Sequence, residues 1–200
     1  MLISSYENGQ KNFFIVENNT VITKLKFSNT EQGWSNFLKG EDDIDSVIIE
    51  AGSVSERTLR YLEDLNVPVK MVHPKKARLI AEATIKTDEL DAKRLIDLEK
   101  VGVLPEVWIP PREIRDVRHL CRYRYFLVQI RTKIKNRIHF ELDREDINVK
   151  NLTYKYLETV RDRTIMIDQL YRLLKEINEK IRQVEKEIEK NILRMNILRS

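Results

Sequence analysis

Cysteine, glycine and proline are scarce in this chain of 200 residues, which has one cysteine, five glycines and five prolines. The single cysteine, Cys121, excludes an internal disulfide and any zinc site built on cysteines, and its helical surroundings predict a buried thiol. With 34% charged residues, the composition indicates much solvated helix. No apolar run reaches roughly 18 residues and no signal segment is evident, so we expect a soluble, cytoplasmic protein without a membrane span.

Positive charge is concentrated in one segment, although the net charge is only +4. Residues 112–137 hold nine lysines or arginines against two acids, which predicts a nucleic-acid contact. Tyr123, Tyr125 and Phe126 lie among these cations and are either stacking platforms for unpaired bases or core aromatics on a solvated helix. The predicted contact residues are Arg118, Arg122, Arg124, Arg131, Lys133, Lys135 and Arg137.

The first half of the chain predicts a mixed sheet covered by helices. Alternating apolar residues on either side of a turn at 17–19 predict an antiparallel hairpin over 11–27, with a further strand at 2–6. A short helix carrying Trp34 and Phe37 follows. Strands at 46–50 and 68–72 then alternate with helices at 53–65 and 75–83, as in an α/β domain.

Two long helices are predicted after the prolines at 105, 110 and 111. The first runs from Glu113 to about 140, a polar loop covers 143–151, and the second runs from about Tyr154 towards the C-terminus. The second carries a heptad seam, formed by Leu170, Leu174, Ile177, Ile181, Val184 and Ile188. We expect a homodimeric coiled coil through residues 165–199, or else packing against the helix at 113–140 of the same chain.

Three carboxylates suggest a site for a divalent metal ion. Glu50 ends the apolar run that starts at Val47, and Asp88 and Asp91 share one helix face because they lie three residues apart. Hard oxygen ligands suit Mg²⁺ or Mn²⁺, as in nucleases of the RNase H-like type. Alternatively, Thr87 caps the helix and the acids only complement its dipole.

Five ordered blocks resemble the N-terminal domain of DEDD insertion-sequence transposases of the IS110 type, the family that includes a pilin-gene invertase. The blocks lie at 47–52, 69–74, 86–92, 108–111 and 131–137. The resemblance implies an RNase H-like (RuvC-like) mixed sheet with flanking helices, followed by a long coiled-coil helix. It divides the chain into a transposase domain at 1–145, which includes the basic helix at 113–140, and a helical extension at 146–200.

The resemblance implies that Glu50, Asp88 and Asp91 are the second, third and fourth acids of the family's catalytic set. An ungapped alignment puts Ser5 at the first acid, with Ser4 and Tyr6 as neighbouring alternatives and Glu7 as a conceivable replacement. The family's C-terminal serine domain has no counterpart in these residues. By resemblance the partners are DNA and a structured guide RNA.

The leading prediction is therefore a truncated DEDD transposase that binds DNA, related to Mg²⁺-dependent phosphodiester cleavage and strand transfer but catalytically impaired. One alternative is a noncatalytic nucleic-acid-binding dimerisation module that keeps the fold without the chemistry. Another is a RuvC-like Holliday-junction resolvase, against which the missing first acid argues.

Overall fold

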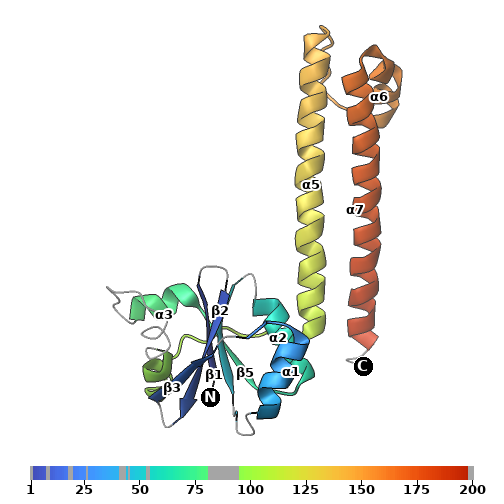
Figure 1. Ribbon diagram of the computed structural model, residues 1–200. Helices are drawn as coiled ribbons and strands as arrows, with labels where there is room; N and C mark the ends of the chain where they lie inside the picture. Colours follow the sequence, from blue (N-terminus) through green and yellow to red (C-terminus); the bar gives the residue numbers. More distant parts are fainter. Residues whose placement is uncertain are drawn as a thin grey trace. The chain divides into compact units, whose positions relative to one another are not determined.

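The chain forms two compact units, Met1–Ile109 and Pro110–Ser200 (Figure 1). The computed structural model describes residues 2–7, 10–17, 20–25, 27–40, 44, 46–52, 55–80 and 95–197. The basic helix belongs by its contacts to the second unit. The expected division into functional domains at residue 145 stays a prediction.

The first unit is built on a mixed sheet of five strands in the order β3-β2-β1-β4-β5. Its strands are β1 (Leu2–Glu7), β2 (Gln10–Glu17), β3 (Thr20–Leu25), β4 (Val47–Glu50) and β5 (Val69–Val72). The first three strands pair antiparallel, whereas β1, β4 and β5 run parallel. The predicted hairpin, the additional first strand and the mixed sheet are confirmed.

Helices cover both faces of this sheet, because successive residues of β4 point to opposite sides. Val47 and Ile49 join one cluster with Trp34, from α1 (Glu31–Gly40), and with residues of α2 (Ser55–Asp64). Ile48 joins a second cluster with Val72, with a residue of α3 (Pro74–Ile80) and with the helical segment 95–100. The helices predicted at 53–65 and 75–83 therefore exist, as far as the second lies within the described residues.

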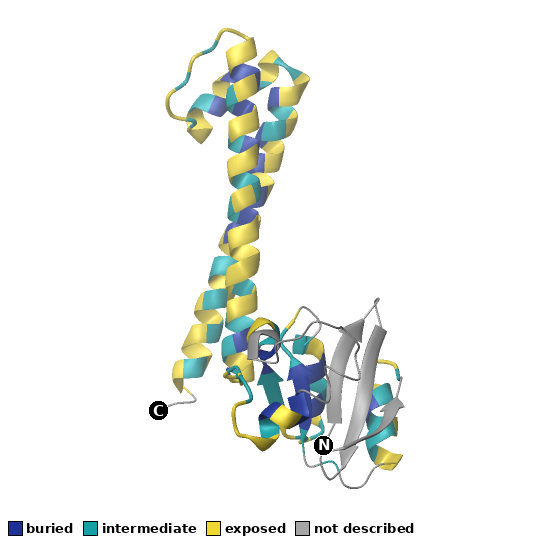
Figure 2. Cartoon of the chain, turned by 90° about the vertical axis from the view of Figure 1, so that its left-hand side faces the viewer, coloured by how far each residue is buried: buried dark blue, intermediate teal, exposed yellow. Residues whose placement is uncertain are grey.

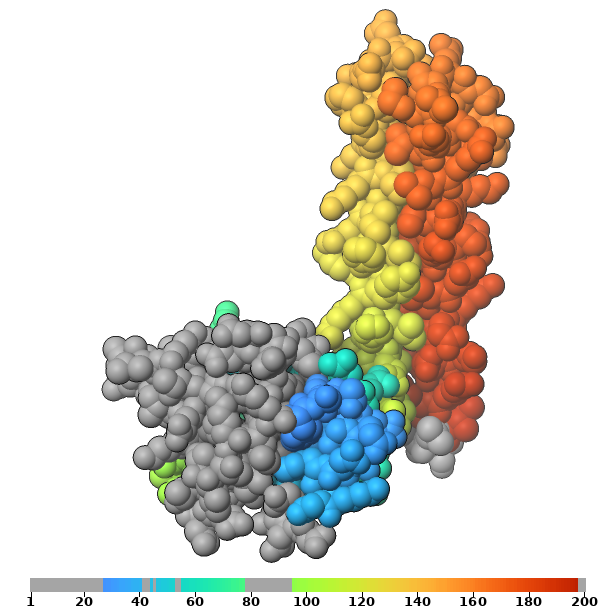
Figure 3. Space-filling model, viewed as in Figure 1, coloured from blue at the N-terminus to red at the C-terminus, as the bar shows by residue number. Residues whose placement is uncertain are grey.

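The second unit is an antiparallel helical hairpin. Its arms are α5 (Arg112–Arg144) and α7 (Ile165–Ile197), which lie against each other along their length (Figures 1 and 3). The buried positions follow the contact between the two helices (Figure 2). The core comprises Leu127, Ile134, Ile138, Leu142, Leu157, Val160, Ile167, Tyr171, Leu174, Ile177 and Ile181.

Part of the heptad seam of the last helix is buried inside this hairpin. Leu174, Ile177 and Ile181 pack against α5 of the same chain. The structure therefore shows the intrachain alternative for this part of the seam. The argument that the seam needs a second copy no longer applies to these residues.

The sequence predicted one unbroken helix from about Tyr154 towards the C-terminus, and this prediction is wrong. A short helix, α6 (Tyr154–Val160), and a 3₁₀ turn, Arg161–Arg163, precede α7. Thr153 caps α6, and Thr164 starts α7 anew after the break. Each hydroxyl accepts a hydrogen bond from a backbone N–H three residues on, at 3.2 Å in both cases. Threonine at such a position starts a helix.

Cys121 is exposed, so the prediction of a buried thiol is wrong. The side of α5 that faces α7 is set by Leu127, Ile134 and Ile138. Cys121 lies six residues before Leu127, which places it about 120° away around the helix.

Within the described part of the chain, no helix is both long enough and apolar enough to span a membrane.

Candidate catalytic edge and nucleic-acid interface

Glu50 is the last residue of β4 and lies where the parallel strands end. The N–H of Ala51 donates to the carbonyl oxygen of Val72 at 2.9 Å, so the chain stays beside β5 for one residue beyond Glu50. The N–H of Gly52 donates to the hydroxyl of Ser55 at 3.2 Å, and that hydroxyl donates to the Gly52 carbonyl at 2.6 Å. These bonds hold the turn into α2, while the Glu50 side chain is half-buried.

Strand β1 runs beside β4, and its register decides which of its residues lies next to Glu50. The pairs are Leu2 with Val47, Ile3 with Ile48 and Ser4 with Ile49. The pairing ends there, and the same register continued by one residue would set Ser5 level with Glu50. Ser5 is the position that the sequence alignment assigned to the missing first acid.

The segment that follows Asp91 packs on the same face of the sheet as Glu50. Glu50 and Ile48 are two residues apart on β4 and so share a face. Leu95, four residues after Asp91, is buried with Ile48 in one cluster. The described chain therefore resumes, at Leu95, on the face of the sheet to which Glu50 belongs.

Asp88 and Asp91 themselves lie outside the described residues, so their distances to Glu50 are untested. Among the residues that the structure does describe, no three histidine, cysteine or acidic side chains gather as metal ligands would. The three-acid site stays a prediction.

An ion pair ties the segment after Asp91 to the sheet. Lys70 of β5 donates a short hydrogen bond to Glu99, and its Nζ lies 3.9 Å from a carboxylate oxygen of Glu106. The hydrogen bond to Glu99 raises the pKa of Lys70 above its ordinary value of 10.5. Sequence reasoning missed this pair, because its members are 29 residues apart.

The central part of α5 forms a cationic surface without acids. From residue 117 to residue 140 there are seven lysines or arginines and no aspartate or glutamate. These seven are the residues predicted to contact nucleic acid. They fall into two groups according to their contacts within the hairpin.

Three of the seven are engaged within the hairpin. A guanidinium nitrogen of Arg124 lies 2.6 Å from Glu185 of α7, and Arg131 donates to the side-chain oxygen of Asn178 at 3.4 Å. Arg137 lies 2.6 Å from Glu141 on its own helix. These three side chains therefore take part in contacts that stabilise the hairpin, in addition to any contact with nucleic acid.

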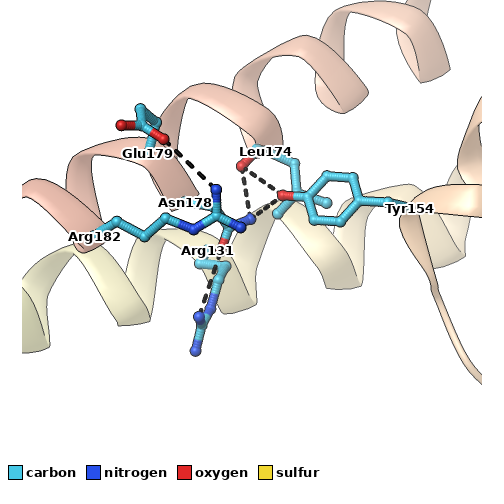
Figure 4. Close-up of polar contacts among 6 residues, drawn as sticks. All are labelled: Arg131, Tyr154, Leu174, Asn178, Glu179 and Arg182. Atoms are coloured by element: carbon cyan, nitrogen blue, oxygen red, sulfur yellow. Dashed lines mark hydrogen bonds and ion pairs between the residues drawn. The ribbon is translucent and has the colours of Figure 1, made fainter.

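Asn178 is the centre of a polar contact that joins α5, α6 and α7 (Figure 4). Its amide nitrogen donates to the hydroxyl oxygen of Tyr154 and, at 2.9 Å, to the carbonyl oxygen of Leu174. Its side-chain oxygen accepts the bond from Arg131. Asn178 lies one turn before Ile181 of the buried seam. A shift of α7 along α5 would separate Asn178 from Arg131, so this polar contact favours one register of the hairpin.

The other four cations present their charge to solvent. Arg118, Arg122 and Lys133 are exposed, and Lys135 is half-buried. Of these, Arg122, Lys133 and Lys135 can contact a phosphate without breaking the contacts described above that hold the hairpin together. They are therefore the better candidates for electrostatic binding.

The aromatic residues of this helix are exposed, which excludes the alternative that they are core residues. The exposed fractions are 44% for Tyr123, 63% for Tyr125 and 53% for Phe126. The rings of Tyr123 and Phe126 stack, with centroids 6.4 Å apart and planes inclined by 24°. The interface therefore combines cations with accessible ring faces.

Comparisons with known proteins give one family. The family model described as a transposase, DEDD type of the IS110 group, matches residues 10–147. No curated protein matches the chain. The family match covers more than half of the sequence, from β2 through the whole of α5, and includes Glu50, whereas β1 precedes it. The chain belongs to the IS110-type DEDD transposase family.

Proposed function

We propose that the first unit is an RNase H-like (RuvC-like) transposase domain whose catalytic edge is formed by Glu50, Asp88 and Asp91. An antiparallel meander joined through β1 to parallel β4 and β5 is the topology expected of such a domain, and the sheet order supports it. The burial of Leu95, Ile96 and Leu98 on the face of Glu50 supports a shared site. Transposition of DNA is the reaction to which this edge is related.

The carboxylate oxygens of these residues are ligands that suit Mg²⁺ or Mn²⁺, but three acids carry one negative charge fewer than the family's four. Glu50 offers carboxylate oxygens at a half-buried edge, and Asp88 and Asp91 would add two further carboxylates. A bound ion would polarise the scissile phosphate and lower the pKa of an attacking water. Glu50 and the two aspartates would hold the ion and, without it, repel one another.

The observation that carries this proposal is the parallel register of β1 and β4, which, continued by one residue, would set Ser5 level with Glu50. A serine hydroxyl can ligate a cation but cannot offset its charge. We therefore propose weak metal binding and poor or absent DNA cleavage by this chain.

Restoring the acid tests the proposal. Ser5→Asp should strengthen Mn²⁺ or Mg²⁺ binding in calorimetry, whereas Glu50→Gln and Asp88→Asn should each abolish it. Ser4→Asp is the matched control, because Ser4 is level with Ile49, which is buried on the opposite face. A gain in Ser4→Asp but not in Ser5→Asp would contradict the assignment, as would native cleavage equal to that of Ser5→Asp. In that case Glu7 is the next acid to test.

The second unit binds DNA through α5 in this proposal. With three phosphates neutralised by Arg122, Lys133 and Lys135, log affinity for duplex DNA should fall against log salt with a slope of about −2.7. Arg122→Gln should reduce the magnitude of that slope by about 1. Arg124→Gln should leave the slope nearly unchanged and instead lower hairpin stability, because Arg124 is paired with Glu185. RNA is a further partner to test, by family resemblance.

A noncatalytic nucleic-acid-binding module is the second candidate, favoured by Ser5, the neutral residue that the continued register would set level with Glu50. It predicts salt-sensitive binding with no gain in cleavage after Ser5→Asp.

Homodimerisation through residues 165–199 stays a prediction. It now rests on the apolar residues near the end of α7, such as Ile192, which is exposed, and Met195, which is half-buried. Sedimentation at micromolar concentration should give twice the chain mass if these residues pair between copies.

A further inference from the structure

We propose that one exposed face of α5 binds an unpaired strand of nucleic acid by stacking bases on Tyr125 and Phe126. This inference deepens the proposed function and rests on the proposal that α5 binds nucleic acid. The face, called the outer stripe below, is formed by Arg118, Arg122, Tyr125, Phe126, Gln129 and Lys133, all of which are exposed.

The members of the outer stripe lie on one side of the helix. Apart from the adjacent Tyr125 and Phe126, successive positions are three or four residues apart, so they form a continuous row. From Arg118 to Lys133 the row is about 22 Å long at about 1.5 Å per residue. The seam towards α7, marked by Leu127 and Ile134, lies on another side. The outer stripe can therefore bind a ligand without opening the hairpin.

The charge of the stripe points to a polyanion. Three of its six members are cations, and no acid occurs in the sequence from residue 117 to residue 140. On the facing helix, Glu185 is paired with Arg124. A phosphate backbone lying along the stripe would meet cations at both of its ends, Arg118 and Arg122 at one and Lys133 at the other.

The rings point to bases that are not paired. In a duplex the base faces are covered by their neighbours, and a helix in the major groove reads polar base edges. The ring of Phe126 is already stacked on one side with Tyr123, while more than half of its surface stays exposed. Positions one turn apart on a helix are separated by about 5.4 Å. Tyr125 and Phe126 are consecutive instead, so their side chains diverge by about 100° around the helix. Bases stacked on the two rings would be splayed apart from each other.

An apolar protein surface fits the stripe less well. A partner helix needs an unbroken apolar seam. The stripe has only two apolar residues, Tyr125 and Phe126, and polar side chains flank them on both sides. A second copy of this chain would bring the same cations to the contact, and like charges repel. Anionic single strands satisfy both the charges and the rings.

Binding of labelled single strands and duplex by fluorescence anisotropy tests the inference with the full chain. The probes are an oligothymidylate, an oligouridylate and a duplex of the same length. We expect the native chain to bind a single strand more tightly than the duplex, and the preferred one of the two homopolymers identifies DNA or RNA as the source. Tyr125→Ala with Phe126→Ala should weaken single-strand binding about fivefold or more, yet change duplex binding by less than twofold.

Leu193→Ala is the matched control, because it truncates a side chain of α7 that is 62% exposed. It should leave all three affinities unchanged. Tyr125→Trp gives a second measurement that does not depend on affinity alone. Stacking on a base should quench its added fluorescence, after subtraction of the signal from Trp34 and Trp108 of the native chain.

Three results would overturn the inference. Equal affinity for duplex and single strand, unchanged by the aromatic double variant, would refute stacking and leave phosphate binding by α5 intact. If the native chain bound none of the three probes, the proposed nucleic-acid function would be refuted as well. A native dimer that becomes monomeric in the double variant would assign the rings to a contact between copies.

Discussion

Ile181 lies in the middle of the contact between α5 and α7, with 3% of its surface exposed. The variant Ile181→Ala removes every side-chain carbon beyond Cβ from the hairpin core. At about 0.8 kcal/mol for each buried carbon, the lost transfer free energy is about 2.4 kcal/mol. A residual cavity adds to this, so we expect the free energy of unfolding to fall by about 3 kcal/mol, within the usual range of about 2 to 5.

Ile192→Ala is the control for this measurement. Ile192 lies on the same helix and is 44% exposed. Both variants exchange isoleucine for alanine in α7, so the change in helix propensity is the same and the difference between them reports burial. We expect Ile192→Ala to change the free energy of unfolding by less than about 0.5 kcal/mol.

Urea denaturation followed by helical circular dichroism, with sedimentation in parallel, separates the two ways of burying Ile181. If the hairpin is intramolecular, Ile181→Ala lowers stability independently of protein concentration and leaves the mass unchanged. The reasoning is refuted if Ile181→Ala costs less than about 1 kcal/mol, or if its only effect is to convert a native dimer to monomer.

Two further predictions concern the first unit. Because Glu99 raises the pKa of Lys70 above 10.5, the ion pair stabilises the fold fully below about pH 10.5 and ceases to do so as the pH rises through the raised pKa. Lys70→Met should therefore reduce the alkaline fall in urea midpoint, and an identical fall in both proteins would contradict this. Gly33→Ala should strongly destabilise the unit, because the added Cβ would lie 2.0 Å from the carbonyl oxygen of Ser28. Gly40→Ala, on the same helix, meets nothing within 4 Å and should be neutral or stabilising in thermal melts; equal effects would refute the clash.

Much of the first unit could be predicted because local signals agreed there. The alternation of the hairpin and the apolar run ending at Glu50 each indicate a strand from neighbouring residues alone. Register between strands is not a local signal. That the register, continued by one residue, would set Ser5 level with Glu50 follows from pairing across more than 40 residues of chain, and only the family alignment suggested it beforehand.

The hairpin was harder to predict, because a heptad seam records that a helix is covered but not which helix covers it. Apolar side chains such as Leu174 and Ile181 are required whether α7 packs against α5 or against a second copy of the chain. The functional division among the cations was also hidden. Arg124 and Arg131 contact residues 61 and 47 positions away, and nothing in their neighbourhood distinguishes them from Arg122.

The register of the hairpin has a consequence for its length. Arg124 contacts Glu185 and Arg131 contacts Asn178, so one step of seven residues along α5 matches one step of seven back along α7. The chain therefore enters and leaves the hairpin at the same end (Figure 1). Deleting one heptad from each arm would shorten the hairpin by about 10 Å and leave the spacing of its two open ends unchanged. The hairpin can thus serve as a ruler whose length varies in whole heptads without disturbing the sequences that flank it.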